Sequence, residues 1–348
     1  MNILDHAPPF ATLAIGSVPF LNPDQALDLL AGLDIPAAPQ MVGLSFWEDM
    51  IFGSVDGLPF IKVIEAEKRL VVEEKDLGDN LAKFYEDFYA GDFSFLDLNP
   101  KSSVGLRAFW ARAKADPTFG PEYLKAQVVG PLTLAQSLRL SSGGSAVDDP
   151  NVLEALSLGL GAKAAFLAAQ IRKLGRKAIV FVDEPGLTGY GSAFSTLSAQ
   201  TVLKALGQAV ETAKSQGPVA IGCHVCGNTD WGLLAQAGLD ILNFDAYSHL
   251  EPFCLYPKEL ETFLAKGGYI AFGLVPTEAY VPEMTALDLL KVFKAGLKPL
   301  ESHIDPDLLA QRTLFTTSCG LGSLKPKAAL AILRLLAQVA KTARGSTL

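Results

Sequence analysis

The feature that most constrains the fold is a repeated alternation of a short apolar run and a helical pattern. Most of the runs are almost continuously hydrophobic, which is typical of parallel strands covered on both faces. Eight runs can be marked, at residues 12–18, 38–42, 126–130, 178–183, 219–226, 240–245, 269–276 and 314–319. Eight alternations of strand and helix predict an α/β fold, a parallel (β/α)8 TIM barrel.

Two of the intervening helices have clear starting signals. Asp149 is a predicted N-cap followed by Pro150 at the first helical position, and apolar residues then recur at helical spacing over residues 153–171. Pro326 likewise opens the last helix, which ends in basic residues that suit its dipole.

One connection is much longer than a βα unit requires, because residues 43–125 separate the second and third predicted strands. It contains a hairpin-like segment, PFIKVIEAEKRLVVE, and helical patterns near residues 80–90 and 103–114. An insertion of this length after strand two is expected to cover the barrel mouth as a lid. No linker-like change of composition interrupts the chain, so we expect residues 1–348 to form one domain.

Composition argues against several function classes. The net charge is -8, with 29 Lys and Arg against 37 Asp and Glu, so nucleic acid and anionic membranes are poor partners. The chain is 49% hydrophobic and 19% charged, which is typical of a well-buried, enzyme-like core. Because no basic leader and no charge-free run of 18 apolar residues is seen, we expect neither a signal peptide nor a membrane span. Four clustered cysteines predict a reducing, cytoplasmic location.

The segment AIGCHVCGNTDW, at residues 220–231, offers metal ligands. On a strand His224 and Cys226 lie on one face and Cys223 on the other. Asp245 ends the next strand and Cys319 ends the last, and the strand ends of a barrel converge on one mouth. Zinc is held by such nitrogen, sulfur and oxygen ligands. The sequence therefore predicts a Zn²⁺ site in which these two cysteines, His224 and Asp245 are the ligands.

The cysteines also allow roles that involve no metal. Cys226 and Cys319 could be small buried hydrophobic residues, since free cysteine is commonly buried. Cys223 and Cys226 have the spacing of a redox pair, but such a pair begins a helix, and on a strand the two sulfurs face opposite ways. Cys254 lies in a loop after a proline and is expected to be structural.

Carboxylates and a serine lie at the ends of other predicted strands. The strand at 178–183 runs directly into Asp183 and Glu184, whose burial requires cationic or hydrogen-bonding partners. They serve either to recognise an amino group or to cap the following loop. Ser17 follows a glycine that lets the backbone approach a ligand. Glu48 and Asp49, at the base of the insertion, could reach the mouth or form a solvated helical turn.

The segments IGSVP, VVGPLT, VFVDEP, HVCGN and TSCGLG occur in an order that resembles the catalytic C-terminal barrel of cobalamin-independent methionine synthase, in a single-barrel core form. The likeness runs over residues 12–336 and lies within the superfamily of uroporphyrinogen decarboxylase and the methylcobamide:thiol methyltransferases. It implies the same four zinc ligands. It also assigns three residues to the amino and carboxylate groups of homocysteine: Ser17, Glu48 and Asp183.

The chain departs from this family at several positions. The family's third ligand is usually Glu, one methylene longer than Asp245, and the match at Glu48 can equally be drawn at Asp49. The folate-using members have an N-terminal barrel, which this sequence does not contain. They also have an Asp-x-His at the end of the seventh strand, where this chain has Phe272-Gly273-Leu274.

The last departure bears on the methyl donor. Methyltetrahydrofolate leaves as an amine that must be protonated, so its use requires a positioned acid. Neither Phe272 nor Leu274 can donate a proton, and His249 and His303 are the plausible histidines elsewhere. A methylcorrinoid leaves as a low-valent cobalt ion and needs no proton. We therefore expect methylcobalamin or a methylated corrinoid protein as donor, with the insertion shaping the docking surface.

The expected reaction is in-line transfer of the methyl group to the zinc-held thiolate of homocysteine, which forms methionine. Two thiolates and a carboxylate leave the site with a net charge of about -1 and keep the substrate sulfur electron-rich. Transfer to another thiol, such as coenzyme M, is an alternative. Porphyrinogen decarboxylation is a second, although nine scattered arginines suit it poorly. A non-enzymatic module that binds zinc or a corrinoid protein is a third.

Overall fold

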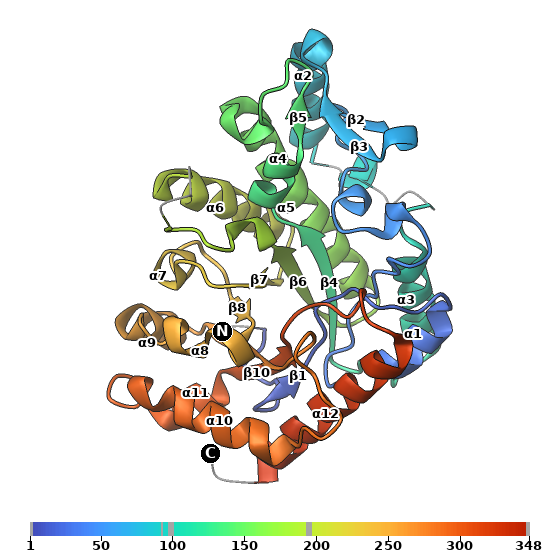
Figure 1. Cartoon of the computed structure of the whole chain (residues 1–348). Helices are drawn as coiled ribbons and strands as arrows, with labels where there is room; N and C mark the ends of the chain where they lie inside the picture. Colours follow the sequence, from blue (N-terminus) through green and yellow to red (C-terminus); the bar gives the residue numbers. More distant parts are fainter. Residues whose placement is uncertain (1–2, 92, 97–100, 193–196, 346–348) are drawn as a thin grey trace.

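A parallel sheet of seven strands, in the order β1-β10-β9-β8-β7-β6-β4, forms the centre of the computed structural model. The model describes residues 3–91, 93–96, 101–192 and 197–345. In sheet order the strands are Ala11–Thr12, Thr313–Thr317, Tyr269–Val275, Ile241–Phe244, Ala220–Val225, Lys177–Asp183 and Tyr123–Val129. Every neighbouring pair is parallel. Figure 1 shows these strands surrounded by helices.

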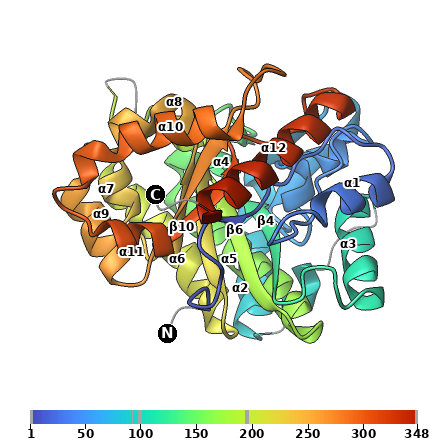
Figure 2. The same ribbon diagram turned by 90° about the horizontal axis from the view of Figure 1, so that it is seen from below.

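Twelve α-helices lie within the described residues. They are α1 (Pro23–Leu30), α2 (Leu77–Tyr89), α3 (Val104–Ala115), α4 (Pro131–Ser137), α5 (Pro150–Lys173), α6 (Ala199–Ser215), α7 (Trp231–Leu234), α8 (Ala246–Phe253), α9 (Pro257–Ala265), α10 (Ala286–Leu297), α11 (Pro306–Gln311) and α12 (Pro326–Gly345). Helices α10 and α12 pack side by side, as Figures 1 and 2 both show.

The predicted starts of two helices are confirmed. The side chain of Asp149 accepts hydrogen bonds from the backbone N–H groups of Asn151 and Val152, and α5 begins at Pro150. Helix α12 begins at Pro326. Among the described helices, α5 alone is long and apolar enough to cross a membrane, yet most of its apolar stretch is buried within the protein. It packs against α6 and β6, as a core helix does.

The second predicted strand, residues 38–42, does not form. Residues 35–40 instead make isolated parallel bridges to both edges of the sheet, namely Leu13–Ile35, Ser17–Gln40 and Ala37–Lys125. Pro36 and Pro39 lack backbone N–H groups, so a continuous ladder of hydrogen bonds cannot form here. The prediction of regular strands is therefore confirmed at six positions and wrong for this one, while of residues 12–18 only Thr12 lies in a strand, the two-residue β1. The curled sheet is consistent with a TIM-like barrel.

Side chains on the two faces of the sheet enter separate apolar clusters. The inner cluster draws on all seven strands: its members include Ala11, Leu13, Ile35, Tyr123, Ile179, Phe181, Ala220, Ile241, Tyr269, Ala271 and Leu314. A larger cluster lies between the strands and the helices. Because residues alternate along each strand, inner-face residues near the strand ends point toward a common centre.

The long connection contains the elements that its sequence predicts. Strand β2 (Ile61–Ile64) pairs antiparallel with β3 (Arg69–Val72), and helices α2 and α3 follow. Strand β5 (Arg139–Leu140), which the sequence did not predict, adds to β3. Helix α2 packs against α5 and α3 against α1, so both lie against outer helices (Figure 1). Ser54 Oγ accepts a hydrogen bond from Val129 N at the end of β4, at 3.3 Å. Coverage of the mouth stays a prediction.

A buried lysine ties this connection to α5. Lys163 is 2% exposed, and its ammonium donates hydrogen bonds to the carbonyl oxygens of Ser54 and Asp56, each at 3.1 Å. Burial lowers the pKa of Lys163 to about 8, although the charge of Asp56 acts in the opposite direction. The folded protein therefore holds this proton less tightly than the unfolded chain does.

The free energy of unfolding is expected to rise by about 3 kcal/mol from pH 8 to pH 10.5 because of Lys163. In this range the unfolded chain keeps a proton that the folded protein has released, so a higher pH favours the folded state. Below pH 8 both states are protonated, and the cost of burial is constant. Denaturant titrations across this range should show a rise that is about 3 kcal/mol smaller in Lys163→Met than in wild type, because burial also lowers the pKa of Lys125 to about 8 and that lysine contributes a rise in both proteins. The same dependence of unfolding free energy on pH in both proteins would contradict the lowered pKa of Lys163.

Candidate metal centre

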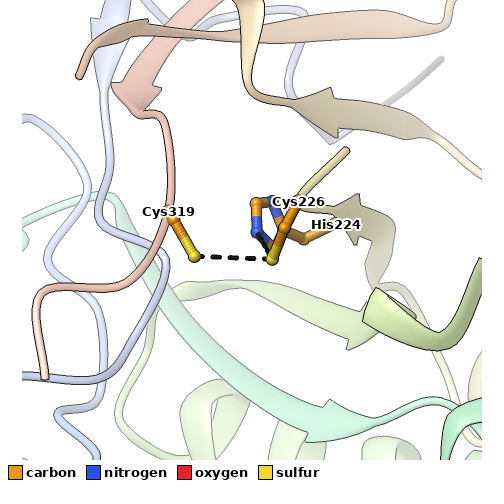
Figure 3. Close-up of side chains that lie close together, drawn as sticks. All are labelled: His224, Cys226 and Cys319. Carbon is orange, nitrogen blue, oxygen red and sulfur yellow. Dashed lines mark hydrogen bonds between the residues drawn. The ribbon is translucent and has the colours of Figure 1, made fainter. Parts of the chain in front are cut away.

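Three of the four predicted ligands come together in the structure. His224 is the last residue but one of β7, Cys226 follows directly after the strand, and Cys319 follows β10. The distance from His224 Nε2 to Cys226 Sγ is 3.1 Å, and the two sulfurs are 3.4 Å apart (Figure 3). The ligand atoms of all three residues lie within 4.8 Å of one another. A tetrahedral zinc site with bonds of about 2.0–2.3 Å places its ligand atoms about 3.3–3.8 Å apart, so this donor set fits zinc.

The loop that carries Cys319 is held by hydrogen bonds from both sides. Strand β10 has an irregular register between Thr316 and Thr317, beside β9. Thr317 Oγ1 donates to the carbonyl oxygen of Cys319, at 2.8 Å. The N–H group of Ser318 donates to the carbonyl of Val275, at 2.9 Å, at the end of β9. These contacts fix the backbone from which the Cys319 thiol points at Cys226.

The contact between the two sulfurs shifts the pKa values of the two thiols in opposite directions. The hydrogen bond from Cys226 lowers the pKa of Cys319 to about 4, with His224 acting in the same direction, while burial opposes the shift. The same contact with Cys319, together with burial, raises the pKa of the Cys226 thiol. Removing both protons would leave two negative charges in contact, which a divalent cation would neutralise.

Asp245 lies outside this group of three. It follows β8, as the sequence predicts, but its carboxylate accepts a hydrogen bond from the backbone N–H of Ser248, at 3.0 Å, and caps α8. Aspartate is favoured at this position because it satisfies a free N–H group at the start of a helix. Its charge still contributes to the raised pKa of Cys226, so it lies nearby. Its role as fourth ligand stays a prediction.

Asp183 is a buried acceptor with an unused oxygen. It ends β6 in register with His224 on β7, and it is 2% exposed. Its Oδ1 atom has no hydrogen-bond partner among the residues that the structure describes. Burial raises the pKa of Asp183, the charges of Lys125 and His224 lower it, and Cys319 raises it. A buried carboxylate oxygen without a donor is costly, so this position favours a cationic or hydrogen-bonding ligand.

Lys125 is a neighbouring charge that the sequence patterns did not single out. Its ammonium is fully buried, donates to Ile15 O and Gln127 Oε1, and lies 4.4 Å from the ring centroid of Phe181. Burial lowers its pKa to about 8, and the charge of Asp183 acts in the opposite direction. The available signal was a lysine within an otherwise apolar strand, YLKAQVV. Its positive charge partly balances that of Asp183.

The sequence offers Glu184 a capping role on the loop that follows it, but in the structure its carboxylate caps a different segment, the start of α4. Its carboxylate accepts hydrogen bonds from the backbone N–H groups of Leu132 and Thr133, at 3.0 and 2.8 Å, and from Thr133 Oγ1. These donors form the start of α4, so the DEP and GPLT segments are bonded to each other. Burial raises the pKa of Glu184 to about 7, against the hydrogen bonds from Thr133 and Leu132.

Ser17 lies beside the loop that follows Cys319. Its Oγ accepts a hydrogen bond from Gly322 N, at 3.3 Å, and its carbonyl oxygen accepts one from Leu321 N, at 2.9 Å. Ser17 therefore borders the cysteine loop, and its contact with a substrate carboxylate stays a prediction.

Glu48 is buried and bonded to backbone at both oxygens. Its carboxylate accepts from Met41 N and Val104 N, and so joins the segment after residue 40 to the start of α3. Asp49 is half-buried and accepts from Ile51 N, at 2.8 Å. A contact of Glu48 with substrate stays a prediction, and it would require one of these backbone bonds to be shared.

Phe272 and Leu274, on which the expected methyl donor depended, do not face the site. Phe272 is fully buried in the outer cluster, with its ring centroid 4.8 Å from that of Phe293 on α10 and 5.7 Å from that of Phe244. Leu274 belongs to the same cluster. The expectation that these two side chains stand where an acid would act is therefore wrong. Strand alternation places Gly273, which has no side chain, on the inner face at this level.

Cys223 and Cys254 are buried outside the group of three. Cys223 belongs to the outer cluster, and burial raises the pKa of its thiol. Cys254 donates to Gly296 O at 3.6 Å, and burial raises its pKa to about 11. All four cysteines are free.

Asn243 is a further residue at the centre that the sequence patterns did not single out. It is fully buried on the inner face of β8, and its Oδ1 lies 2.6 Å from His224 Nδ1. The available signal was a polar residue inside the apolar run ILNF. Only the pairing of β7 with β8, which places His224 opposite Asn243, shows that the two side chains meet.

Comparison with known proteins shows similarity in structure alone. No model of a protein family matches the sequence, and no curated protein matches it. The chain is similar to a B12-independent methionine synthase from Shewanella sp. W3-18-1 in complex with selenomethionine, with a TM-score of 0.57 and 16% identity over 97% of this chain and 98% of that one. For a GH113 β-mannanase from Alicyclobacillus acidocaldarius the TM-score is 0.45 and the identity 10%, over 96% and 97% of the chains. The first similarity shows that this chain and the synthase share a fold.

Proposed function

We propose that the protein is a zinc-dependent methyltransferase that methylates the thiol of homocysteine and so forms methionine. The observation that carries the proposal is a group of His224, Cys226 and Cys319 next to Asp183, a buried carboxylate with an unused oxygen. A soft metal centre suits the sulfur of an amino-acid thiol, and a buried carboxylate suits its ammonium group. The fold shared with a methionine synthase supports the same function.

The residues of the site have separate tasks in this proposal. His224, Cys226 and Cys319 would hold the metal, with Asp245 as the fourth ligand once it releases the N–H group of Ser248. Zinc there would keep the substrate thiol deprotonated and nucleophilic at neutral pH.

The amino-acid end of the substrate would be bound by two other residues. Asp183 would accept the ammonium group through Oδ1, which has no other donor among the described residues. Ser17, beside the loop after Cys319, would donate to the carboxylate. Fixing both ends of the substrate orients its sulfur for in-line attack on the methyl group.

We propose methylcobalamin or a methylated corrinoid protein as the methyl donor. The support is the end of β9, where alternation places Gly273 and Val275 on the inner face and neither residue offers a proton donor. His303 is exposed just before α11, which leads into the start of β10, so it lies at the far end of the strands from Cys319. His249, in α8 four residues after Asp245, is the histidine on the site's side.

Metal analysis followed by a screen of thiol acceptors tests the function. We expect about one zinc ion per chain and methylation of homocysteine in preference to 2-mercaptoethanesulfonate. A protein that holds no metal, or that methylates only thiols without an amino group, would contradict the proposal. A zinc-loaded protein that methylates no thiol would favour a non-enzymatic binding module.

Asp183→Asn is expected to weaken homocysteine binding about 10- to 100-fold, because the amide keeps the shape but loses the charge that pairs with ammonium. Binding of 4-mercaptobutanoate, which has the thiol and the carboxylate but no amino group, should change little. Calorimetric titration of both thiols into both proteins measures the difference. Equal losses for the two ligands would remove Asp183 from this role.

A further inference from the structure

The side chain of Asn243 is held by three hydrogen bonds in the barrel interior. Its Nδ2 atom donates to the carbonyl oxygen of Ala271, at 2.7 Å, and to Thr316 Oγ1, at 2.9 Å. Thr316 Oγ1 in turn donates to Thr317 O, at 2.9 Å, so it is an acceptor toward Asn243. The third contact is that of Oδ1 with His224 Nδ1. Asn243 thus links β8 to β9, to β10 and to the histidine on β7.

These contacts determine which way the amide points. Rotation of the amide by 180° would place Oδ1 against the carbonyl oxygen of Ala271, two acceptors 2.7 Å apart. Oδ1 must therefore face His224, and because it can only accept, Nδ1 must carry the hydrogen. Nε2 of the neutral ring is then left with its lone pair. That atom is the one 3.1 Å from Cys226 Sγ.

We infer that Asn243 is a positioning residue that holds His224 in the Nδ1–H tautomer, with Nε2 directed at the metal. The inference rests on the proposed zinc-dependent function and deepens it. A ligating histidine commonly donates its other N–H to an acceptor that fixes its ring and its tautomer. Here the acceptor is a neutral amide, which orients the ring without adding charge to a site that already has two thiols and Asp183.

The amide is itself fixed by the neighbouring strands. Its partner Ala271 O belongs to β9 and Thr316 to β10, the strand that leads to Cys319. The ring of His224 and the loop of Cys319 are therefore positioned through one connected set of hydrogen bonds. A protein without the Asn243 acceptor would leave Nδ1 buried without a partner and free the ring to adopt the other tautomer.

The test uses Co²⁺ as a spectroscopic probe on purified, metal-free protein. Asn243→Leu keeps the approximate shape of the side chain and removes its polar atoms. We expect it to bind Co²⁺ about 10- to 100-fold more weakly than wild type, with an altered thiolate-to-cobalt charge-transfer spectrum. Phe244→Leu is the matched control, since it alters the next residue of β8 on the opposite face. It should lower stability and leave Co²⁺ affinity and spectrum unchanged.

A second measurement needs no variant and no metal. Nitrogen-15 spectra of histidine-labelled wild-type protein at neutral pH should show His224 as the Nδ1–H tautomer. An Nε2–H tautomer, or an Asn243→Leu variant with wild-type Co²⁺ affinity and spectrum, would overturn the inference while leaving the proposed function standing. Wild-type protein that binds no Co²⁺ would overturn the proposed function and the inference together.

Discussion

Replacement of Cys226 or Cys319 by serine is expected to reduce bound zinc from about one ion per chain to less than about a tenth of that, with the fold retained. A serine hydroxyl stays protonated at neutral pH, so each variant loses a ligand and its negative charge. The fold should survive because a chain of this size buries enough surface to fold without a metal. Elemental analysis after gel filtration gives the zinc content, and circular dichroism reports the fold.

Cys254→Ser is the matched control for these two variants. Cys254 is also buried, but its thiol donates to Gly296 O and takes no part in the group of three. This variant should keep its zinc and its activity even if it is less stable. Full zinc occupancy in Cys226→Ser or Cys319→Ser would show that the metal site is misassigned.

Homocysteine offered with methylcobalamin as sole donor is expected to yield methionine, whereas homocysteine offered with methyltetrahydrofolate is expected to yield none above background. The folate amine is a poor leaving group until it is protonated, and a positioned acid contributes about 10²- to 10⁴-fold to such a step. At the end of β9 the inner face carries Gly273 and Val275, and neither is an acid. Methionine can be quantified by mass spectrometry with each donor alone.

Turnover with methyltetrahydrofolate and none with methylcobalamin would overturn the donor proposal. It would mean that another residue protonates the folate, and His249→Gln would then be the first variant to examine. Turnover with methylcobalamin that His249→Gln leaves unchanged would support a step that needs no acid. His303→Gln, at the far end of the strands, serves as the matched histidine control.

Much of the candidate site could be predicted because the alternation of side chains along a strand determines which residues share a face. The spacing of His224 and Cys226 puts both on one face of β7, and the structure brings them to Cys319 across 93 positions of sequence. The prediction for Asp245 was less complete, since the same residue type that ligates zinc also caps helices. Its bond to Ser248 is decided by the N–H groups that α8 presents, which strand periodicity does not describe.

The error at Phe272 and Leu274 has a simple origin. A likeness in position at the end of a strand does not say which face each side chain takes. The ring contacts of Phe272 with Phe244 and Phe293 show that it lies on the helix-covered face. A shift of one residue in a strand exchanges inside for outside. The donor proposal therefore depends on Gly273 instead.

By itself, the sequence determined the kinds of element and the residues able to ligate a metal, because helix starts, strand periodicity and ligand chemistry are local properties. Asp149 and Pro150 carry the start signal of α5 within their own segment, and a His-x-Cys on a strand presents both side chains together. Only the tertiary structure decided the partners of buried polar groups. Glu184 caps α4, Asp183 is left with an unused oxygen, and Asn243 meets His224. Such pairings join residues on different strands. They depend on the register between strands, which no single segment encodes.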